Sequence, residues 1–236
     1  MNTIFLDFDG VLFDSVKEAY LLARCAYKGI NVKSKIDNTE YKKFYKYRYL
    51  ISKSWQFYYI FKLILNNVPD NYFEKEYNSY IANIENNAVT EFDKKYVKSR
   101  ENLIKSDFVF WDNLDTPFDF FFKIKELSQD KKYKFIILTN KKKLPVKNKL
   151  EKFSLNVELF ANEDLSKYAS KGAFIQKYMQ DNNIEKCFFV DDSMDNINSC
   201  LEYNNIKSLL ANWGYVNPKH TGYSSDEILN IIKTEM

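Results

Sequence analysis

The sequence predicts an α/β protein built on a doubly wound parallel sheet, with a smaller all-helical domain inserted into it. Short, continuous apolar runs occur at the start of the 236-residue chain and again in its second half, as is typical of parallel strands buried on both faces. Amphipathic helical patterns separate the later runs, and a long segment after the first run shows no strand pattern. These three observations together favour this class over an all-α or all-β protein.

The expected strands are the four apolar runs at residues 4–6, 135–138, 188–190 and 208–211. A helix is expected to begin at Thr116 and Pro117, with threonine as the cap and proline in the first turn. The apolar stripe of that helix would consist of Phe118, Phe121, Phe122 and Leu127.

The segment from residue 15 to residue 96 is predicted to be the helical insert. It is too long for a loop, and its densest part reads KKFYKYRYLISKSWQFYYIFKLIL. We expect its many aromatic side chains to pack among the helices. The α/β core would then comprise residues 1–14 and 97–236.

Composition excludes several classes of protein. A net charge of +3 is too small to favour binding to nucleic acid or to a membrane surface. Cys25, Cys187 and Cys200 form no CxxC pair, which argues against a disulfide framework or a zinc site. Asp7 and Asp9 lie where the apolar part of a secretion signal would fall, so we expect a cytoplasmic protein.

Polar residues follow three of the apolar runs at the point where each strand should end. In a parallel α/β sheet, ligands bind beyond the carboxyl ends of the strands, so these side chains should converge. They are Asp7 and Asp9, Thr139 and Asn140, and Asp191 and Asp192.

Four carboxylates in one crevice repel one another, and a divalent cation would remove that repulsion. Because all the ligands are oxygens, Mg²⁺ is the expected cofactor. Such an ion beside a phosphate suggests phosphoryl transfer, which needs further groups to hold phosphate oxygens. Lys171, Thr139 and Asn140 supply side chains for this, and Gly10 lets main-chain amides approach an anion.

Four stretches in this order, DFDGVLFDS, ILTN, SKG and FVDDSMDN, resemble the motifs of the haloacid dehalogenase-like (HAD) superfamily. ANWGY at residues 211–215 is similar to the segment that follows the last motif in many phosphatases of that family. The resemblance spans most of the chain. It implies a Rossmann-like core, a helical cap between the first two motifs that closes over the site, and a hinge near Asp14 and Ser15.

The resemblance also implies roles for individual residues. Asp7 resembles the nucleophile that becomes an aspartyl-phosphate, and Asp9 the acid and base that also offers its main-chain carbonyl to the metal. Thr139 resembles the phosphate-binding hydroxyl, and Lys171 the lysine that holds nucleophile and phosphate together.

The last motif implies the remaining metal ligands. Asp192 resembles a direct ligand and Asp191 a ligand that binds directly or through water, while Asp195 and Asn196 would brace the loop. The DDSMDN form departs from the commoner glycine-aspartate form, so which of the two neighbouring aspartates contacts the ion stays open.

Three weaker candidates complete the set. Arg48, in the insert, is a possible contact for a substrate carboxylate or second phosphate, although a surface position is the simpler interpretation. The run from Lys141 to Lys143 is expected to be a solvated helix start. His220, the only histidine, is given no role, and its isolation argues against a Ser-His-Asp hydrolase.

The function that these features favour is an Mg²⁺-dependent phosphatase acting on a small phosphorylated metabolite such as a sugar, polyol or amino-alcohol phosphate. The order of the motifs excludes a response-regulator receiver, and Asp9 argues against a dehalogenase. A phosphomutase or phosphotransferase of the same superfamily stays open, as does a non-catalytic binding protein on this fold. The sequence leaves the substrate and the oligomeric state open.

Overall fold

A computed structural model describes residues 1–235, and the chain forms two compact units. One unit contains Met1–Asp14 together with the chain from Thr116 onward, and the other contains Ser15–Asp115. The boundary expected at residue 96 is wrong, because that position lies inside the continuous helix α5 (Asn86–Ser106). Buried side chains continue along this helix as far as Leu103, so the helical unit extends beyond the expected end.

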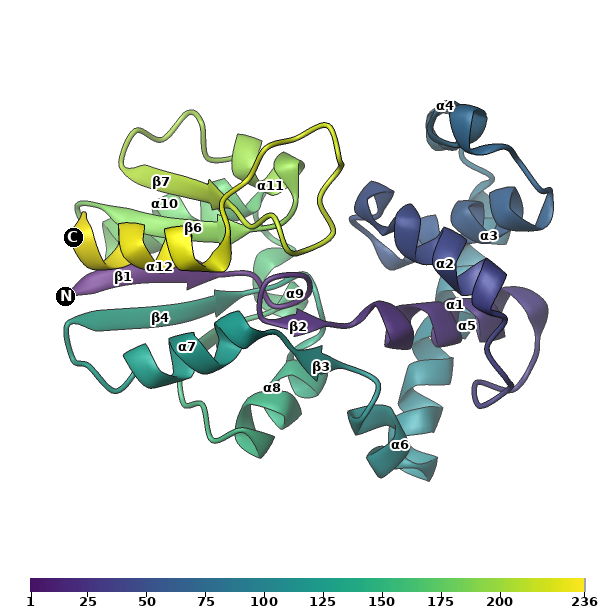
Figure 1. The fold of residues 1–236 in the computed structure, drawn as a ribbon, viewed down its shortest axis with the longest axis horizontal. Coiled ribbons are helices and arrows are strands. Elements are labelled where there is room, and N and C mark those ends of the chain that lie inside the picture. Colours follow the sequence, from purple (N-terminus) through teal and green to yellow (C-terminus); the bar gives the residue numbers. More distant parts are fainter. Residues whose placement is uncertain (236) are drawn as a thin grey trace. The chain divides into compact units, whose positions relative to one another are not determined.

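The core unit is built on a five-stranded parallel sheet with the order β5-β4-β1-β6-β7 (Figure 1). Four of its strands coincide with the predicted apolar runs; the fifth, β5, was not predicted. The strands are β1 (Asn2–Leu6), β4 (Tyr133–Leu138), β5 (Glu158–Phe160), β6 (Cys187–Asp191) and β7 (Ile206–Leu210). The edge strand β5 escaped prediction because it has only three residues and none of them is fully buried.

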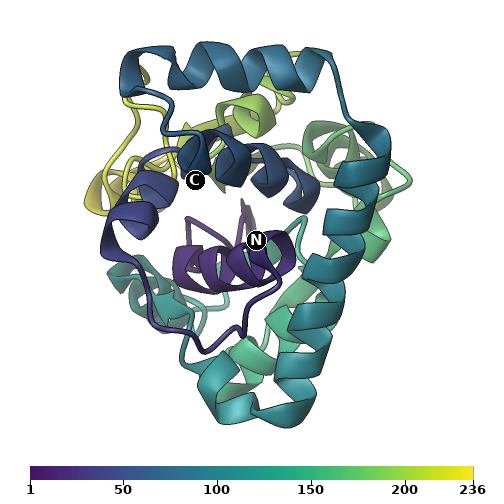
Figure 2. The same cartoon turned by 90° about the vertical axis from the view of Figure 1, so that its right-hand side faces the viewer.

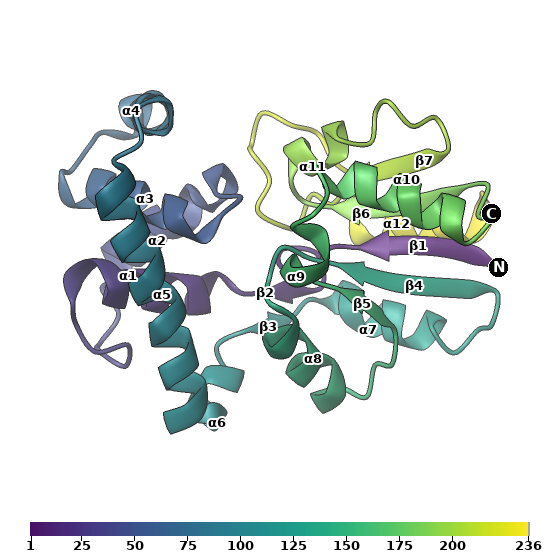
Figure 3. The same ribbon diagram turned by 180° about the vertical axis from the view of Figure 1, so that it is seen from behind.

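Helices cover both faces of this sheet, as a doubly wound fold requires. One face packs against α7 (Asp119–Leu127), α8 (Lys143–Lys152) and α12 (Ser225–Thr234). The other packs against α9 (Asn162–Leu165), α10 (Lys171–Asp181) and α11 (Met194–Asn198). Figure 1 shows α7 and α12 in front of the strands, and Figure 3 shows α10 and α11 from behind.

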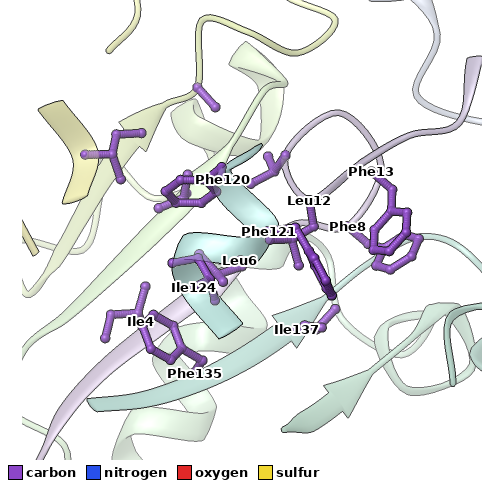
Figure 4. Close-up of a cluster of buried hydrophobic side chains, with 14 of the residues drawn as sticks. Ile4, Leu6, Phe8, Leu12, Phe13, Phe120, Phe121, Ile124, Phe135 and Ile137 are labelled. Atoms are coloured by element: carbon purple, nitrogen blue, oxygen red, sulfur yellow. The ribbon is translucent and has the colours of Figure 1, made fainter. Parts of the chain in front are cut away.

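Alternation along the central strand supplies both hydrophobic layers. Ile4 and Leu6 of β1 belong to the cluster that includes Phe121 and Ile124 of α7 (Figure 4). Phe5, between them, belongs to the opposite cluster. Successive side chains of a strand point to opposite faces, so one fully buried strand stabilises both layers.

The expected start of the helix at Thr116 is wrong. Thr116–Pro117 forms the short strand β3, which pairs antiparallel with β2 (Phe13–Asp14). The helix begins later, at Asp119, and Phe122 is 49% exposed rather than part of the apolar stripe. Proline fits here because β3 has a single strand partner, so the missing N–H costs no second ladder bond.

The helical unit contains only helices within residues 15–115 (Figure 2). They are α1 (Val16–Lys28), α2 (Asn38–Lys46), η1 (Arg48–Leu50), η2 (Ser54–Gln56), α3 (Phe57–Leu65), α4 (Asp70–Ala82), α5 and α6 (Phe108–Asp112). Aromatic rings pack between them, for example Tyr20 against Phe44 and Phe61. Among the described residues, no helix combines the length and the apolar character that crossing a membrane requires.

Candidate active site

The loop after β1 places two carboxylates at the carboxyl edge of the sheet. Asp7 is 8% exposed, and its Oδ1 accepts the main-chain N–H of Phe8 at 2.8 Å. Gly10 has a φ of +85°, and a Cβ at this position would lie 2.0 Å from Asp192 Oδ2. Only glycine fits such a turn and such a close approach. The Gly10 N–H donates to the Phe13 carbonyl at 2.8 Å, and the approach of main-chain amides of this loop to an anion stays a prediction.

The end of β6 brings a second pair of carboxylates to the same place. Asp191 is completely buried and accepts the Ser193 N–H at 2.8 Å, and the Asn196 side-chain amide contacts both of its oxygens. Asn196 therefore braces this loop as predicted, whereas the side chain of Asp195 is exposed. Asp192 is 6% exposed.

Lys171 is the first residue of α10, and its ammonium lies between two of these carboxylates. Its Nζ is 2.9 Å from Asp7 Oδ1 and 2.8 Å from Asp191 Oδ2. The helix begins here because the Ser170 hydroxyl accepts the Ala173 N–H as an N-cap. Burial by itself lowers the pKa of Lys171, but the Asp191 and Asp7 carboxylates outweigh it and hold the pKa above its usual value.

Three carboxylates form a cluster at this edge of the sheet. Asp7, Asp191 and Asp192 each offer a carboxylate oxygen within 4.8 Å of the others, and the Lys171 ammonium contacts Asp7 and Asp191. Burial raises the pKa of Asp7 well above its usual range; Lys171 opposes this rise, and Asp191 and Asp192 add to it. Three clustered carboxylates, two of which raise the pKa of the third, suit a hard divalent cation with oxygen ligands, so these residues fit Mg²⁺.

The loop after β4 adds a hydroxyl and a lysine to this edge of the sheet. Thr139 is 1% exposed, and its hydroxyl accepts the Lys141 N–H at 3.1 Å, whereas Asn140 is exposed. The expectation that Lys141 is solvated is wrong. Its ammonium is buried and lies 3.1 Å from Asp9 Oδ1. Lys141 is followed by Lys142 and Lys143, and a run of three lysines is typical of a solvated surface. Its position directly after the Thr-Asn pair at a strand end was the feature that could have indicated a place in the site.

The loop after β7 contributes contacts whose importance the motif alone did not indicate. The Trp213 indole N–H donates to the Val11 carbonyl at 3.0 Å. The main-chain N–H of Tyr215 donates to Asp192 Oδ2 at 2.6 Å, and its hydroxyl donates to Asp14 Oδ1 at 2.8 Å. The segment similar to the family's ANWGY therefore holds the loop after β1 and a carboxylate of the acidic cluster.

Arg48 lies in the helical unit, where its guanidinium contacts its own neighbourhood. It donates to the Ile51 carbonyl at 2.8 Å and lies over the Phe57 ring, 5.5 Å from the centroid. These contacts give it a structural role, and binding of substrate by Arg48 stays a prediction. His220 lies in an exposed loop, as expected of a residue without a role in the site.

The fold and the site define a class of protein: an open parallel α/β sheet with carboxylates after β1 and β6, a hydroxyl after β4 and a buried lysine at a helix start. This is the arrangement expected from the motifs of haloacid dehalogenase-like hydrolases.

Comparison with solved structures agrees with this class. A haloacid dehalogenase-like family hydrolase from Streptococcus pneumoniae aligns over 98% of this chain and 97% of its own, with a TM-score of 0.58 and 15% identity. A predicted phosphoglycolate phosphatase from Haemophilus somnus has the same coverage and identity, with a TM-score of 0.64. A HAD-superfamily hydrolase of subfamily IA from Geobacter sulfurreducens aligns over 98% and 96%, with a TM-score of 0.59 and 13% identity.

The chain therefore has the fold of the haloacid dehalogenase-like superfamily. No protein-family model matches the sequence. No curated protein matches it either.

Proposed function

We propose that this protein is an Mg²⁺-dependent phosphatase that hydrolyses a small phosphomonoester through an aspartyl-phosphate on Asp7. The observation that carries the proposal is the buried cluster of Asp7, Asp191 and Asp192 around Lys171 at the carboxyl edge of the sheet. The hydrolase and phosphatase names of the structural neighbours support the same reaction class.

In the first step Asp7 attacks phosphorus. The Lys171 ammonium and the Phe8 amide both contact Oδ1, so we assign Oδ2 as the attacking oxygen. An oxygen–phosphorus bond forms as the bond to the leaving alcohol breaks, and Asp9 gives its proton to the leaving oxygen. Thr139 and Asn140 are the groups that would hold the other phosphate oxygens.

In the second step water attacks the phosphorus of the aspartyl-phosphate. Asp9, now ionised, takes a proton from that water, and Asp7 is released as a carboxylate. The Lys141 ammonium lies 3.1 Å from Asp9 Oδ1 and would hold this carboxyl in place. Lys171 keeps Asp7 in place through both steps.

Asp7 and Asp192 would hold Mg²⁺, with the main-chain carbonyl of Asp9. When bound, the ion supplies positive charge to the phosphate oxygens and lowers the cost of bringing an anion to a carboxylate nucleophile. Asp191 already accepts hydrogen bonds from Lys171, Ser193 and Asn196. We therefore propose that its main role is to hold Lys171 in place.

A phosphomutase is the second candidate, since it would use the same groups. The two differ only in what accepts the phosphoryl group from Asp7, namely water or a second hydroxyl of the intermediate. Release of inorganic phosphate as the main product would therefore favour the phosphatase.

The first experiment measures phosphate release from a panel of small phosphomonoesters, with Mg²⁺ and with a chelator. The panel includes 2-phosphoglycolate and sugar, polyol and amino-alcohol phosphates. Release should require Mg²⁺, and Asp7→Asn should lower kcat by at least about 1,000-fold because the amide is not a nucleophile.

Asp195→Asn is the matched control, because Asp195 is an exposed carboxyl a few residues from the cluster. It should retain full activity. Turnover that survives Asp7→Asn would overturn the role of Asp7. A folded protein that binds Mg²⁺ but releases no phosphate would overturn the phosphatase in favour of a mutase or a binding protein.

A further inference from the structure

Tyr215 donates hydrogen bonds from different parts of the residue, and the proposed chemistry does not use them. Its main-chain N–H donates to Asp192 Oδ2, and its phenol O–H donates to Asp14 Oδ1. Asp14 is the last residue of the core unit before the chain enters the helical unit. One residue therefore joins a carboxylate of the acidic cluster to the point at which the chain leaves the core.

The backbone packs closely around Asp192, the carboxylate that accepts the Tyr215 N–H. A Cβ on Gly214 would lie 2.3 Å from the Gly10 carbonyl oxygen and 2.5 Å from Asp192 Cβ. A Cβ on Gly10 would lie 2.0 Å from Asp192 Oδ2. The Asp192 carboxylate thus sits between two glycines, and a shift of the loop after β7 would shift the carboxylate.

The loop after β7 has two side-chain anchors. Trp213 donates to the Val11 carbonyl, and its ring centroid lies 4.8 Å from that of Phe120. This indole fixes the first half of the loop against the core. The hydroxyl of Tyr215 fixes the second half, where the N–H that holds Asp192 is located.

The partner of that hydroxyl belongs to a small structural element. Asp14 lies in β2 and pairs with Thr116 of β3. The chain passes into the helical unit directly after β2 and returns directly before β3. The Tyr215 hydroxyl therefore contacts the two-stranded ribbon that carries both chain crossings.

We propose that Tyr215 is a positioning residue: it holds Asp192 in place for Mg²⁺ and makes the affinity for the ion depend on the β2–β3 ribbon. This rests on the proposed function, since it takes Asp192 as a metal-holding carboxylate. Groups that hold a metal ligand by hydrogen bonds tune affinity without touching the ion. The alternative is that the hydroxyl bond only stabilises the fold.

Tyr215→Phe separates these roles, because it removes the hydroxyl and keeps the main-chain N–H. Calorimetric titration of the 236-residue chain with MgCl₂ measures the Kd directly, without reference to activity. We expect the Kd for Mg²⁺ to rise about 10-fold. Tyr223→Phe, which removes a hydroxyl from a 41% exposed ring on the same segment, should leave the Kd unchanged.

Variants of the partner test whether the effect passes through Asp14. Asp14→Ala should raise the Kd as much as Tyr215→Phe, and the double variant should show no further increase. Asp14→Asn keeps an acceptor oxygen and should retain most of the affinity. If the increase in Kd of the double variant is the product of the increases of the two single variants, the link to the ribbon is overturned.

A Kd for Tyr215→Phe within about 1.5-fold of wild type would overturn the positioning role, whatever the melting temperature shows. The two proposals fail in different ways. Wild-type protein that binds Mg²⁺ but hydrolyses no ester would overturn the phosphatase and leave this inference standing on the titrations. Wild-type protein that binds no Mg²⁺ would overturn both.

Discussion

Buried carboxylates are placed differently in the two units: Glu18 and Glu40 of the helical unit each have cationic partners from their own unit, whereas three carboxylates of the core unit lie together. Glu18 of α1 is 1% exposed. Its carboxylate accepts two hydrogen bonds from the Arg100 guanidinium, at 2.8 and 3.1 Å, and one from the Trp111 indole N–H at 2.7 Å. In the core unit, Asp7, Asp191 and Asp192 lie within 4.8 Å of one another, and the Lys171 ammonium contacts Asp7 and Asp191. A buried charge with full partners is typical of a structural role, whereas an excess of one sign indicates a place for a ligand.

A second buried carboxylate of the helical unit follows the same pattern. Glu40 accepts the Tyr20 hydroxyl at 2.8 Å, lies 3.1 Å from Arg24 Nε and also pairs with Lys28. Glu18 and Glu40 tie α1 to α5, α6 and α2. The helical unit thus uses buried charge to join its helices, and the core unit concentrates it at one edge of its sheet.

The largest expected effect comes from neutralising one carboxylate in each unit. Glu18→Gln leaves the Arg100 guanidinium without its counter-charge and should lower the free energy of unfolding by about 3 kcal/mol. Asp7→Asn removes one charge from a cluster of three carboxylates, and Lys171 still pairs with Asp191. With a chelator present, the free energy of unfolding should therefore stay equal or rise. Urea unfolding followed by circular dichroism measures both.

Glu91→Gln is the control for the helical unit, because the Glu91 side chain is 68% exposed and pairs with Lys95 one turn away on α5. Its change should be a few tenths of a kcal/mol. A loss of stability in Asp7→Asn as large as in Glu18→Gln would contradict the distinction between the units.

The next effect tests whether Mg²⁺ binds to the carboxylate cluster and thereby stabilises the protein. At a free Mg²⁺ concentration about 100 times the Kd, wild-type protein should gain about 2.7 kcal/mol in unfolding free energy, because the ion binds only the folded site. The same titration should stabilise Glu18→Gln by an equal amount. Asp192→Asn should gain little, and equal stabilisation of this variant would place the ion elsewhere.

The smallest effect compares a glycine from each unit. A Cβ on Gly172, next to Lys171, would lie 2.0 Å from the Ser199 carbonyl oxygen, so Gly172→Ala should cost about 2 kcal/mol through overpacking. Gly29, at the end of α1, has a φ of +69° and open space around it. Gly29→Ala should cost about 1 kcal/mol from backbone strain alone. Thermal unfolding distinguishes them, and equal costs would argue against tight packing behind Lys171.

Local sequence determined much of the core unit. Strands buried on both faces need continuous apolar runs, so β1, β4, β6 and β7 were visible in the residues themselves. Catalytic candidates followed because polar residues such as Asp7, Thr139 and Asp191 come directly after those runs, where parallel strands share one edge. The order of these groups along the chain also indicated the superfamily whose fold the structure shows.

Tertiary structure decided what depends on distant partners. Thr116–Pro117 is a strand because it pairs with β2. Lys141 is buried, unlike the solvated lysine that its neighbours suggest, because it pairs with Asp9. The extent of the helical unit depended on how far α5 stays packed. Tyr215 meets Asp14 across 201 residues. Such contacts leave no local period or composition signal, because they depend on surfaces that exist only once the chain has folded.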